Sequence, residues 1–184
     1  KSLTVADDDW ASTHGGIAGR RFRDLAGVTA DSVNRLKLKW VYAYPGSAAG
    51  PVTIAGKSMF LAGNGYVVAL NADEGCVNWA YPINSRTVRA VTVAPNTAKQ
   101  TGKASSAIAL FGDDSNTVFA LDATTGKAIW QTTLKAHLLG RITAAPTVYD
   151  GVVYVPMSTM EDPLTHDKSY YCCSARGGIA ALDL

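Results

Sequence analysis

The residues of this chain whose types best suit chemistry lie together near its end, in the stretch YYCCSARG at positions 170–177. Its adjacent cysteines, Cys172 and Cys173, can form a disulfide only by closing an eight-membered ring through a twisted or cis peptide bond. The alternative is a pair of reduced thiols that pack as small hydrophobic side chains. Because disulfide geometry is demanding, residue type alone favours the reduced pair.

The strands that must position this stretch follow an eleven-residue repeat. Positions 69–79 read ALNADEGCVNW, positions 120–130 read ALDATTGKAIW, and positions 181–184 (ALDL) begin a third copy. Apolar residues lead into a turn at which Gly75 or Gly126 supplies the positive φ of a tight hairpin. A tryptophan then ends the second strand with a large flat surface to bury. Each copy therefore predicts a strand, a tight turn and a second strand.

The tryptophans recur at a spacing that indicates an array. Trp79 lies 39 residues after Trp40, and Trp130 lies 51 residues after Trp79. Repeats of roughly 40 to 60 residues with short strands are typical of a β-propeller with one four-stranded blade per repeat. We therefore predict an all-β fold with about three blades of a larger propeller of about eight blades. Because three blades cannot close a propeller, we expect other blades, in a longer polypeptide or in other chains, to complete it.

Each blade can be laid out as strands A to D, counted from the propeller axis. The predicted strands are 51–55, 58–62, 66–70 and 76–81 in blade one, 88–94, 107–111, 117–121 and 128–133 in blade two, and 142–149, 151–157 and 178–182 in blade three. Residues 36–42 are predicted as the closing strand of a preceding blade. Antiparallel pairing places the A–B and C–D turns on one face and the B–C and D–A loops on the other. The long loops, including 158–177 with the cysteines, therefore share one face, where binding sites are usually found.

This layout divides the chain into an N-terminal arm over residues 1–35 and a partial propeller over residues 36–184. The arm contains Trp10 and several glycines in an irregular pattern. It is either an extended segment laid over a larger body or a flexible leader. Cys76, the third cysteine, falls in a predicted strand, and we expect it to be buried and inert.

Composition excludes some classes of partner. Hydrophobic residues make up 47% of the chain and charged residues 17%, which is ordinary for a soluble globular protein. The net charge of +2 is too small to suggest a nucleic acid or a membrane surface as partner. No stretch is apolar for long enough to predict a membrane span.

The repeat ALDATTGKAIW resembles the tryptophan-docking motif of quinoprotein alcohol dehydrogenases, propellers that carry pyrroloquinoline quinone (PQQ). The likeness is closest to polyvinyl-alcohol dehydrogenase-like quinohaemoproteins, and it covers nearly the whole chain from Trp10. It rests on LKLKW at 36–40, FGD at 111–113, RIT at 141–143, YVP at 154–156 and the pattern Y-x-C-C-x-x-R-G at 170–177. Non-enzymatic propellers share the tryptophan repeats, whereas the Cys-Cys loop leading into a blade strand is much more specific.

The resemblance implies that Cys172 and Cys173 form a vicinal disulfide that lies against one face of the planar quinone, which reverses the preference for reduced thiols. It also implies that the chain is a segment of a PQQ-dependent dehydrogenase that oxidises a small-molecule or polymeric alcohol. A cytochrome or another electron acceptor and the remaining blades would then be its partners. A disulfide needs an oxidising compartment, so we expect a periplasmic or secreted protein.

PQQ carries three carboxylates, so the resemblance also directs attention to cations on the loop-bearing face. Guanidinium groups pair with carboxylates in a bidentate fork. The candidate cofactor-binding residues are Cys172, Cys173, Arg176, Arg141, His137 and Arg89. The alternative for each arginine, including the less favoured Arg86, is a solvated loop charge, and for His137 it is a structural hydrogen bond. The acids on this face, Glu161, Asp162, Asp113 and Asp114, are expected to be solvated.

Some features of the resembled family have no counterpart here. The stretch SAAGP at 47–51 lacks the cofactor-binding glutamate that methanol-oxidising relatives place there, and no C-x-x-C-H haem site is present. No residue matches the family's Ca²⁺ ligands or its catalytic base, so we expect these outside this segment and assign no catalytic residue. We also expect the segment to be inactive by itself. The alternative function is a non-catalytic propeller of the same repeats that serves as a scaffold or binding module.

Overall fold

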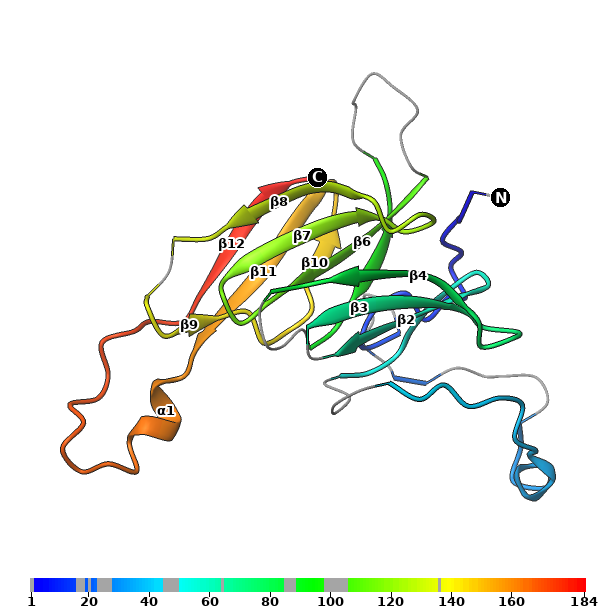
Figure 1. Cartoon of the computed structure of the whole chain (residues 1–184), viewed down its shortest axis with the longest axis horizontal. Helices are drawn as coiled ribbons and strands as arrows, with labels where there is room; N and C mark the ends of the chain where they lie inside the picture. The colour runs from blue at the N-terminus through cyan, green and yellow to red at the C-terminus, as the bar shows by residue number, and fades with distance from the viewer. Residues whose placement is uncertain are drawn as a thin grey trace.

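The chain folds into three four-stranded antiparallel sheets that stand side by side (Figure 1). The computed structural model describes residues 2–15, 19, 21–22, 28–44, 50–63, 65–84, 89–97, 106–135 and 137–184. The three sheets are the three predicted blades, and nearly all regular structure is β, so the predicted partial propeller is confirmed.

The strands follow the predicted A-to-D order in each blade. Blade one contains β1 (Thr53–Ala55), β2 (Ser58–Gly63), β3 (Tyr66–Asn71) and β4 (Val77–Pro82). Blade two contains β5 (Thr92–Pro95), β6 (Ala107–Gly112), β7 (Thr117–Asp122) and β8 (Ala128–Thr133). Blade three contains β10 (Thr147–Tyr149), β11 (Val152–Thr159) and β12 (Gly178–Asp183), with the short β9 (Gly140–Arg141) paired to the end of β11. The short helices are η1 (Val33–Arg35) and α1 (Glu161–Leu164).

In all three blades the inner strand begins later than predicted, in blade one at Thr53. Of the segment predicted at 142–149, only β10 is a strand, and Pro146, which lacks an N–H to donate, lies just before it. In blade two, β5 begins at Thr92 because the carbonyl of Val91 accepts a hydrogen bond from the Thr53 hydroxyl of blade one (2.6 Å). Contacts between blades therefore limit the length of the inner strands. The residue pattern within one strand does not reveal these contacts.

The predicted strand at 36–42 is wrong. Residues 36–44 have no strand assignment, because no strand in the described part of the chain pairs with them. Trp40 nevertheless occupies the position that its place in the repeat predicts. Its indole N–H donates to the carbonyl of Ala72 (3.1 Å), in the C–D turn of blade one.

The tryptophans link each blade to the next through the glycine of the turn. Trp79, at the end of blade one, donates its indole N–H to the carbonyl of Ala123 in blade two (3.1 Å). Its ring covers Gly126, where an added Cβ would lie 2.6 Å from the indole Cδ2. The ring of Trp40 covers Gly75 in the same way, with Cδ2 2.7 Å from an added Cβ, and both glycines have positive φ. Two independent reasons therefore require glycine at each turn: the positive φ of the backbone and the lack of space for a Cβ under the tryptophan ring.

The hydrophobic cores lie between the blades. One cluster joins blades one and two and includes Phe60, Trp79 and Phe111, and a second joins blades two and three and includes Leu110 and Val153. The central strands are therefore buried on both faces, whereas the outermost strands β4 and β8 are largely exposed.

Cys76, which precedes β4 at this outer edge, is exposed, so its predicted burial is wrong. An outermost strand has no further strand to cover it, and the residues around its entry face solvent.

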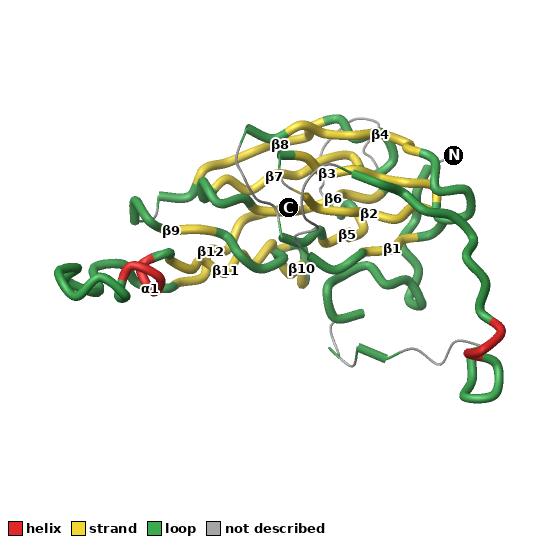
Figure 2. The backbone as a smooth tube through the Cα atoms, turned by 60° about the horizontal axis from the view of Figure 1, so that its bottom comes forward, coloured by secondary structure: helices red, strands yellow, loops and turns green. Residues whose placement is uncertain are grey.

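The N-terminal arm contacts the innermost strands. Trp10 forms an antiparallel bridge with Ile54 of β1, and the N–H of Val93 in β5 donates to the carbonyl of Ala11 (2.8 Å). The described part of the arm therefore crosses from blade one to blade two on the axis side (Figure 2).

The turns and loops separate into the two predicted groups. The N–H of Ala72, in a C–D turn, donates to the carbonyl of Lys57, in the A–B turn of the same blade (2.9 Å). On the other side, the N–H of Ile83 after β4 donates to the carbonyl of Gly65 in the B–C turn (2.8 Å). We call these the turn face and the loop face of the propeller. The loop face carries the cysteines.

Candidate functional site

The cysteine pair lies in the longest loop of the loop face. This cysteine loop (residues 165–177) connects α1 to β12 and, together with α1, projects beyond the sheets of blade three (Figure 1). Cys172 and Cys173 are joined as a disulfide across a cis peptide bond, so the paired form is confirmed and the reduced alternative is wrong. Both cysteines are exposed, and the preceding Tyr171 is 95% exposed. The disulfide therefore forms part of an open surface.

Glu161 is the buried anchor of this loop, although the sequence suggested a solvated carboxylate. It is the first residue of α1, and its side chain is fully buried. Its Oε1 accepts from the Tyr170 hydroxyl (2.7 Å) and from the N–H and hydroxyl of Ser174 (2.9 Å each), and its Oε2 accepts from the N–H of Ala175 (2.6 Å). No short-range pattern announces this role, because the donors lie 9 to 14 residues away.

These hydrogen bonds hold Glu161 in its charged form. The Tyr170 hydroxyl, followed by the N–H of Ser174, lowers the pKa of Glu161 to about 2, against the opposing effect of burial. The same contact raises the pKa of Tyr170 above its ordinary value, because the phenol proton is bound to a carboxylate. The loop is therefore held by charge-assisted hydrogen bonds over the whole neutral pH range.

The structure brings His137 to the cysteine loop. His137 lies between β8 and β9, and its Nε2 is 2.9 Å from the hydroxyl of Ser174. Its Nδ1 accepts from the N–H of Leu139 (3.2 Å). A residue of the D–A loop before blade three is thus linked to the residue that follows the cysteine pair.

Arg176 lies on the cysteine loop itself and is exposed. Its Nη1 donates to the carbonyl of Cys173 (2.9 Å) and to that of Ala175 (3.0 Å). None of the ion pairs found among the described residues involves Arg176. Its position beside the cysteine pair is therefore fixed by the backbone, while its charge faces an open surface.

Arg141 belongs to β9, which pairs with the end of β11 just before Glu161. Its Nη1 lies 3.6 Å from Oδ2 of Asp114, so its partner is an acid of the blade-two B–C loop. The neighbouring Asp113 is buried rather than solvated, because its Oδ1 accepts from the N–H groups of Ser115 and Thr117 (2.9 and 2.8 Å). Asp162, by contrast, is exposed as expected.

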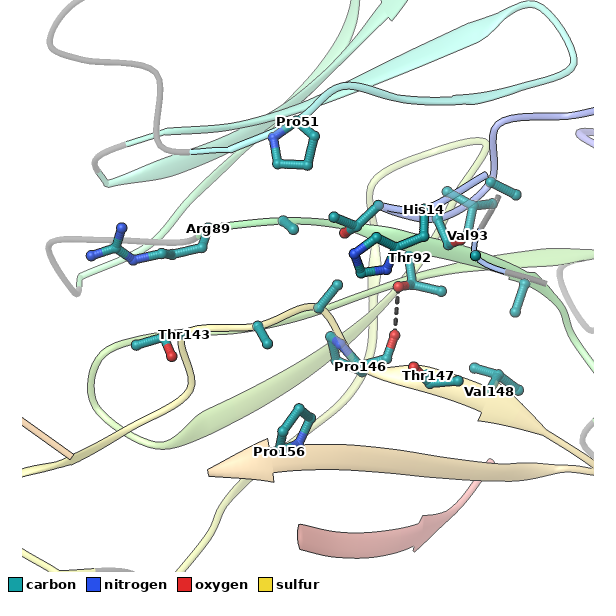
Figure 3. A pocket seen from close by; sticks show the side chains of 18 of the residues that line it. His14, Pro51, Arg89, Thr92, Val93, Thr143, Pro146, Thr147, Val148 and Pro156 are labelled. Carbon is teal, nitrogen blue, oxygen red and sulfur yellow. Dashed lines mark hydrogen bonds between the residues drawn. The ribbon is translucent and has the colours of Figure 1, made fainter. Parts of the chain in front are cut away.

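Arg89 lies at a different place, in a cavity of about 710 Å³ between the inner strands (Figure 3). The arm residue His14, the first residues of β5 and β10, and Pro156 also line this cavity. The hydroxyl of Thr92 donates across it to the carbonyl of Pro146 (2.5 Å), which joins blades two and three. None of the described residues that line the cavity belongs to the cysteine loop. Arg86 lies outside the described residues.

Two negative findings hold for the residues that the structure describes. No group of three or more His, Cys, Asp or Glu side chains is arranged to hold a metal ion in that part of the chain. Within the same residues, none of the helices has the length and apolar character needed to cross a bilayer.

Comparison with known proteins gives consistent findings. The family profile described as "Glucose/ethanol/alcohol dehydrogenase, beta-propeller domain" (PQQ) matches residues 10–132, and the profile "Outer membrane protein assembly factor BamB" matches residues 97–184. The chain is 36% identical over 177 residues to a polyvinylalcohol dehydrogenase of Pseudomonas sp. and 34% identical over 164 residues to one of Sphingopyxis sp. (strain 113P3). These alignments cover 96% and 89% of this chain but only 27% and 25% of the two relatives, so the chain spans about a quarter of their length.

A solved structure supports the fold. The chain is similar to a europium-containing methanol dehydrogenase with a TM-score of 0.73 and 21% sequence identity, over 97% of this chain and 30% of that protein. At this identity the likeness shows a shared propeller architecture.

Proposed function

This chain belongs to the PQQ family of glucose, ethanol and alcohol dehydrogenase β-propellers, and on this premise we propose that it is a segment of a PQQ-dependent alcohol dehydrogenase. In this proposal the segment contributes a disulfide platform and cationic side chains to the cofactor pocket. The observation that carries it is the exposed Cys172–Cys173 disulfide on the loop face.

The residues around the disulfide fit a flat anionic ligand. An exposed pair of sulfur atoms offers a surface against which a planar ring system can lie. Arg176 presents a positive charge on the same loop. Glu161, the buried carboxylate that binds the cysteine loop, has its charge already bound by four hydrogen bonds, so it repels an anion less than a free acid would.

We assign the individual roles from these positions. Arg176 and Arg141 bind carboxylate or quinone oxygens of the cofactor, and His137 orders the cysteine loop through Ser174. Arg89, on the axis side of blade two, binds a more distant part of the same ligand. When PQQ is bound, it supplies the chemistry of alcohol oxidation by accepting two electrons from the alcohol, which becomes a carbonyl compound.

The proposal leaves two parts of the machinery to the rest of the protein. The Ca²⁺ ligands and the base that accepts the alcohol proton are expected from other blades. A cytochrome or another acceptor then takes the electrons from the cofactor. The disulfide favours a periplasmic or secreted location, where thiols are not kept reduced.

The relatives suggest the first substrate to test. Two relatives that match most of this chain are named polyvinylalcohol dehydrogenases, so we propose polyvinyl alcohol, with small secondary alcohols as alternatives. The full-length protein that contains this chain is mixed with PQQ and Ca²⁺, and dye-linked oxidation of each alcohol is measured. We expect PQQ-dependent turnover, and a full-length protein that neither binds PQQ nor reduces the dye would overturn the proposal.

The role of the disulfide is tested with matched cysteine variants. Changing both Cys172 and Cys173 to Ser removes the platform, whereas Cys76→Ser removes an exposed cysteine of blade one. We expect the double variant to bind PQQ at least tenfold more weakly and Cys76→Ser to bind it like the wild type. Circular dichroism of both variants verifies that the propeller is folded.

A second candidate function is a non-catalytic propeller that binds other proteins. The profile match of residues 97–184 to an outer-membrane assembly factor favours it. This function requires neither PQQ nor an intact disulfide. The binding measurements above therefore separate the two candidates.

A further inference from the structure

The charged form of Glu161 is buried beside the cysteine pair, and its placement needs an explanation. A carboxylate is rarely buried unless hydrogen bonds replace the water that it loses. Here the four donors to the carboxylate come from Tyr170, Ser174 and Ala175, all in the cysteine loop. Glu161 itself lies two residues after the end of β11, so it is attached to the sheet of blade three.

The donors bracket the cysteine pair. Tyr170 lies two residues before Cys172, and Ser174 and Ala175 come directly after Cys173. The tyrosine hydroxyl and the two main-chain N–H groups bind one carboxylate from both sides of the pair. Glu161 therefore binds the loop both before the disulfide, at Tyr170, and after it, at Ser174 and Ala175.

The hydrogen-bond directions at Ser174 follow from its partners. Oε1 of Glu161 belongs to a carboxylate and can only accept, so the Ser174 hydroxyl donates to it and its oxygen accepts on the side of His137. The N–H of Leu139 points at Nδ1 of His137, so that nitrogen also accepts. His137 therefore carries its proton on Nε2 and donates it to Ser174.

This direction has a chemical consequence. In a serine nucleophile the hydroxyl proton is bound by a histidine nitrogen that acts as base. At Ser174 the proton is bound by the carboxylate, and the histidine is the donor. The three side chains are therefore arranged to hold the loop and are not arranged for nucleophilic attack.

We propose, on the basis of the dehydrogenase function inferred above, that Glu161 is the positioning residue of the disulfide platform. It fixes the cysteine pair to blade three, and the chain from Glu161 through Ser174 to His137 fixes the same loop to the segment that follows blade two. The platform therefore has its cofactor-binding geometry before any ligand arrives.

The proposal is tested on the cofactor-free, full-length protein with two isosteric variants. Glu161→Gln replaces one acceptor oxygen by an NH₂ group, which must face one of the present donors. Asp162→Asn removes the same charge from the exposed neighbouring residue and serves as the control. Hydrogen exchange is followed by mass spectrometry in peptides that cover residues 170–177 and, for comparison, residues 107–122 of blade two.

We expect Glu161→Gln to speed exchange at residues 170–177 by about tenfold or more, since hydrogen bonds to charged groups are among the strongest. The peptides of blade two and the Asp162→Asn control should exchange at the wild-type rate. Unchanged exchange at 170–177 in a folded Glu161→Gln protein would overturn the proposal. If that variant does not fold, Tyr170→Phe, which removes one donor and keeps the ring, must produce a smaller, few-fold increase at the same peptide.

A PQQ-binding measurement distinguishes this proposal from the function on which it rests. If Glu161 positions the platform, Glu161→Gln weakens PQQ binding. The hydrogen-exchange rates of β6 and β7 stay at the wild-type level in the same variant. Wild-type protein that fails to bind PQQ overturns the dehydrogenase function. In that case a localised exchange effect still supports Glu161 as the anchor of the cysteine loop.

Discussion

The turn face and the loop face of the propeller are built on different principles. At the turn face the same contact is repeated, with an indole ring on a glycine and an indole N–H on a carbonyl, at Trp40 and again at Trp79. At the loop face the contacts are unique, and one carboxylate, Glu161, holds a loop found only in blade three. The turn face therefore sets how the blades associate, and the loop face sets what the assembly can bind.

The largest expected effect is a break of the repeated contact at the turn face. In Gly126→Ala the new Cβ would meet the Trp79 ring and the residue would keep a positive φ. We expect a loss of about 2–4 kcal/mol in the free energy of unfolding, since overpacking and an unfavourable φ add. Urea denaturation of the full-length protein measures it.

Gly19 provides the control for this variant. It also has a positive φ, but a Cβ added there would meet no atom of the described residues within 4 Å. We expect Gly19→Ala to cost about 1 kcal/mol, from the backbone alone. Equal losses in the two variants would contradict the steric role of the tryptophan.

A second prediction concerns the joints between the inner strands. The hydroxyl of Thr53, the first residue of β1, donates to the carbonyl of Val91 before β5, and that of Thr92 donates to Pro146 before β10. Thr92→Val leaves the Pro146 carbonyl unpaired, and we expect it to cost about 1–3 kcal/mol. Calorimetry of the full-length protein measures the loss.

The equivalent residue of blade three is the exposed Thr147. If a further blade joins blade three as blade three joins blade two, Thr147→Val must destabilise the full-length protein by a similar amount. A change within about 0.5 kcal/mol, which is usual for a surface position, would show that the repeated joint stops at blade three.

At the loop face the acid dependence of Glu161 gives a third prediction. Its pKa falls from 4.5 to about 2 on folding. A lowered folded-state pKa contributes stability above about pH 4.5, and this contribution is lost as pH falls from there through about 2. We therefore expect the stability difference between wild type and Glu161→Gln to be constant near neutral pH and to shrink in this acidic window, as measured by urea unfolding at a series of pH values. A difference that stays constant down to pH 2 would contradict the charged anchor.

The smallest effect is expected from an acid of the turn face. Asp73 pairs with Lys57 (3.1 Å) and Lys39 (3.2 Å), and their hydrogen bonds lower its pKa, with Lys57 contributing more. All three side chains are largely exposed, so water and salt screen the attraction. We expect Asp73→Asn to leave the melting temperature of the full-length protein unchanged. A clear fall in the melting temperature would show that the exposed Asp73, like the buried Glu161, contributes to stability.

The repeat made the blades predictable, because each strand pair is formed within about 20 residues of sequence and carries its own turn signal. The same reasoning failed for residues 36–42, where a strand pattern has no partner among the described residues, and for Cys76, which lies at an outer edge. It also placed the starts of two inner strands too early, since hydroxyls of the preceding blade bind the carbonyls of the residues just before β5 and β10.

By itself the sequence determined the four-stranded repeat, the glycine of each tight turn and the place of the cysteine pair on the long-loop side, because these depend on local turns and alternation. Only the tertiary structure decided that Glu161 is buried and that His137 reaches the cysteine loop. Glu161 finds its donors up to 14 residues away, and Ser174 reaches His137 over 37 residues. Such contacts depend on how blades two and three pack, and no local pattern encodes that packing.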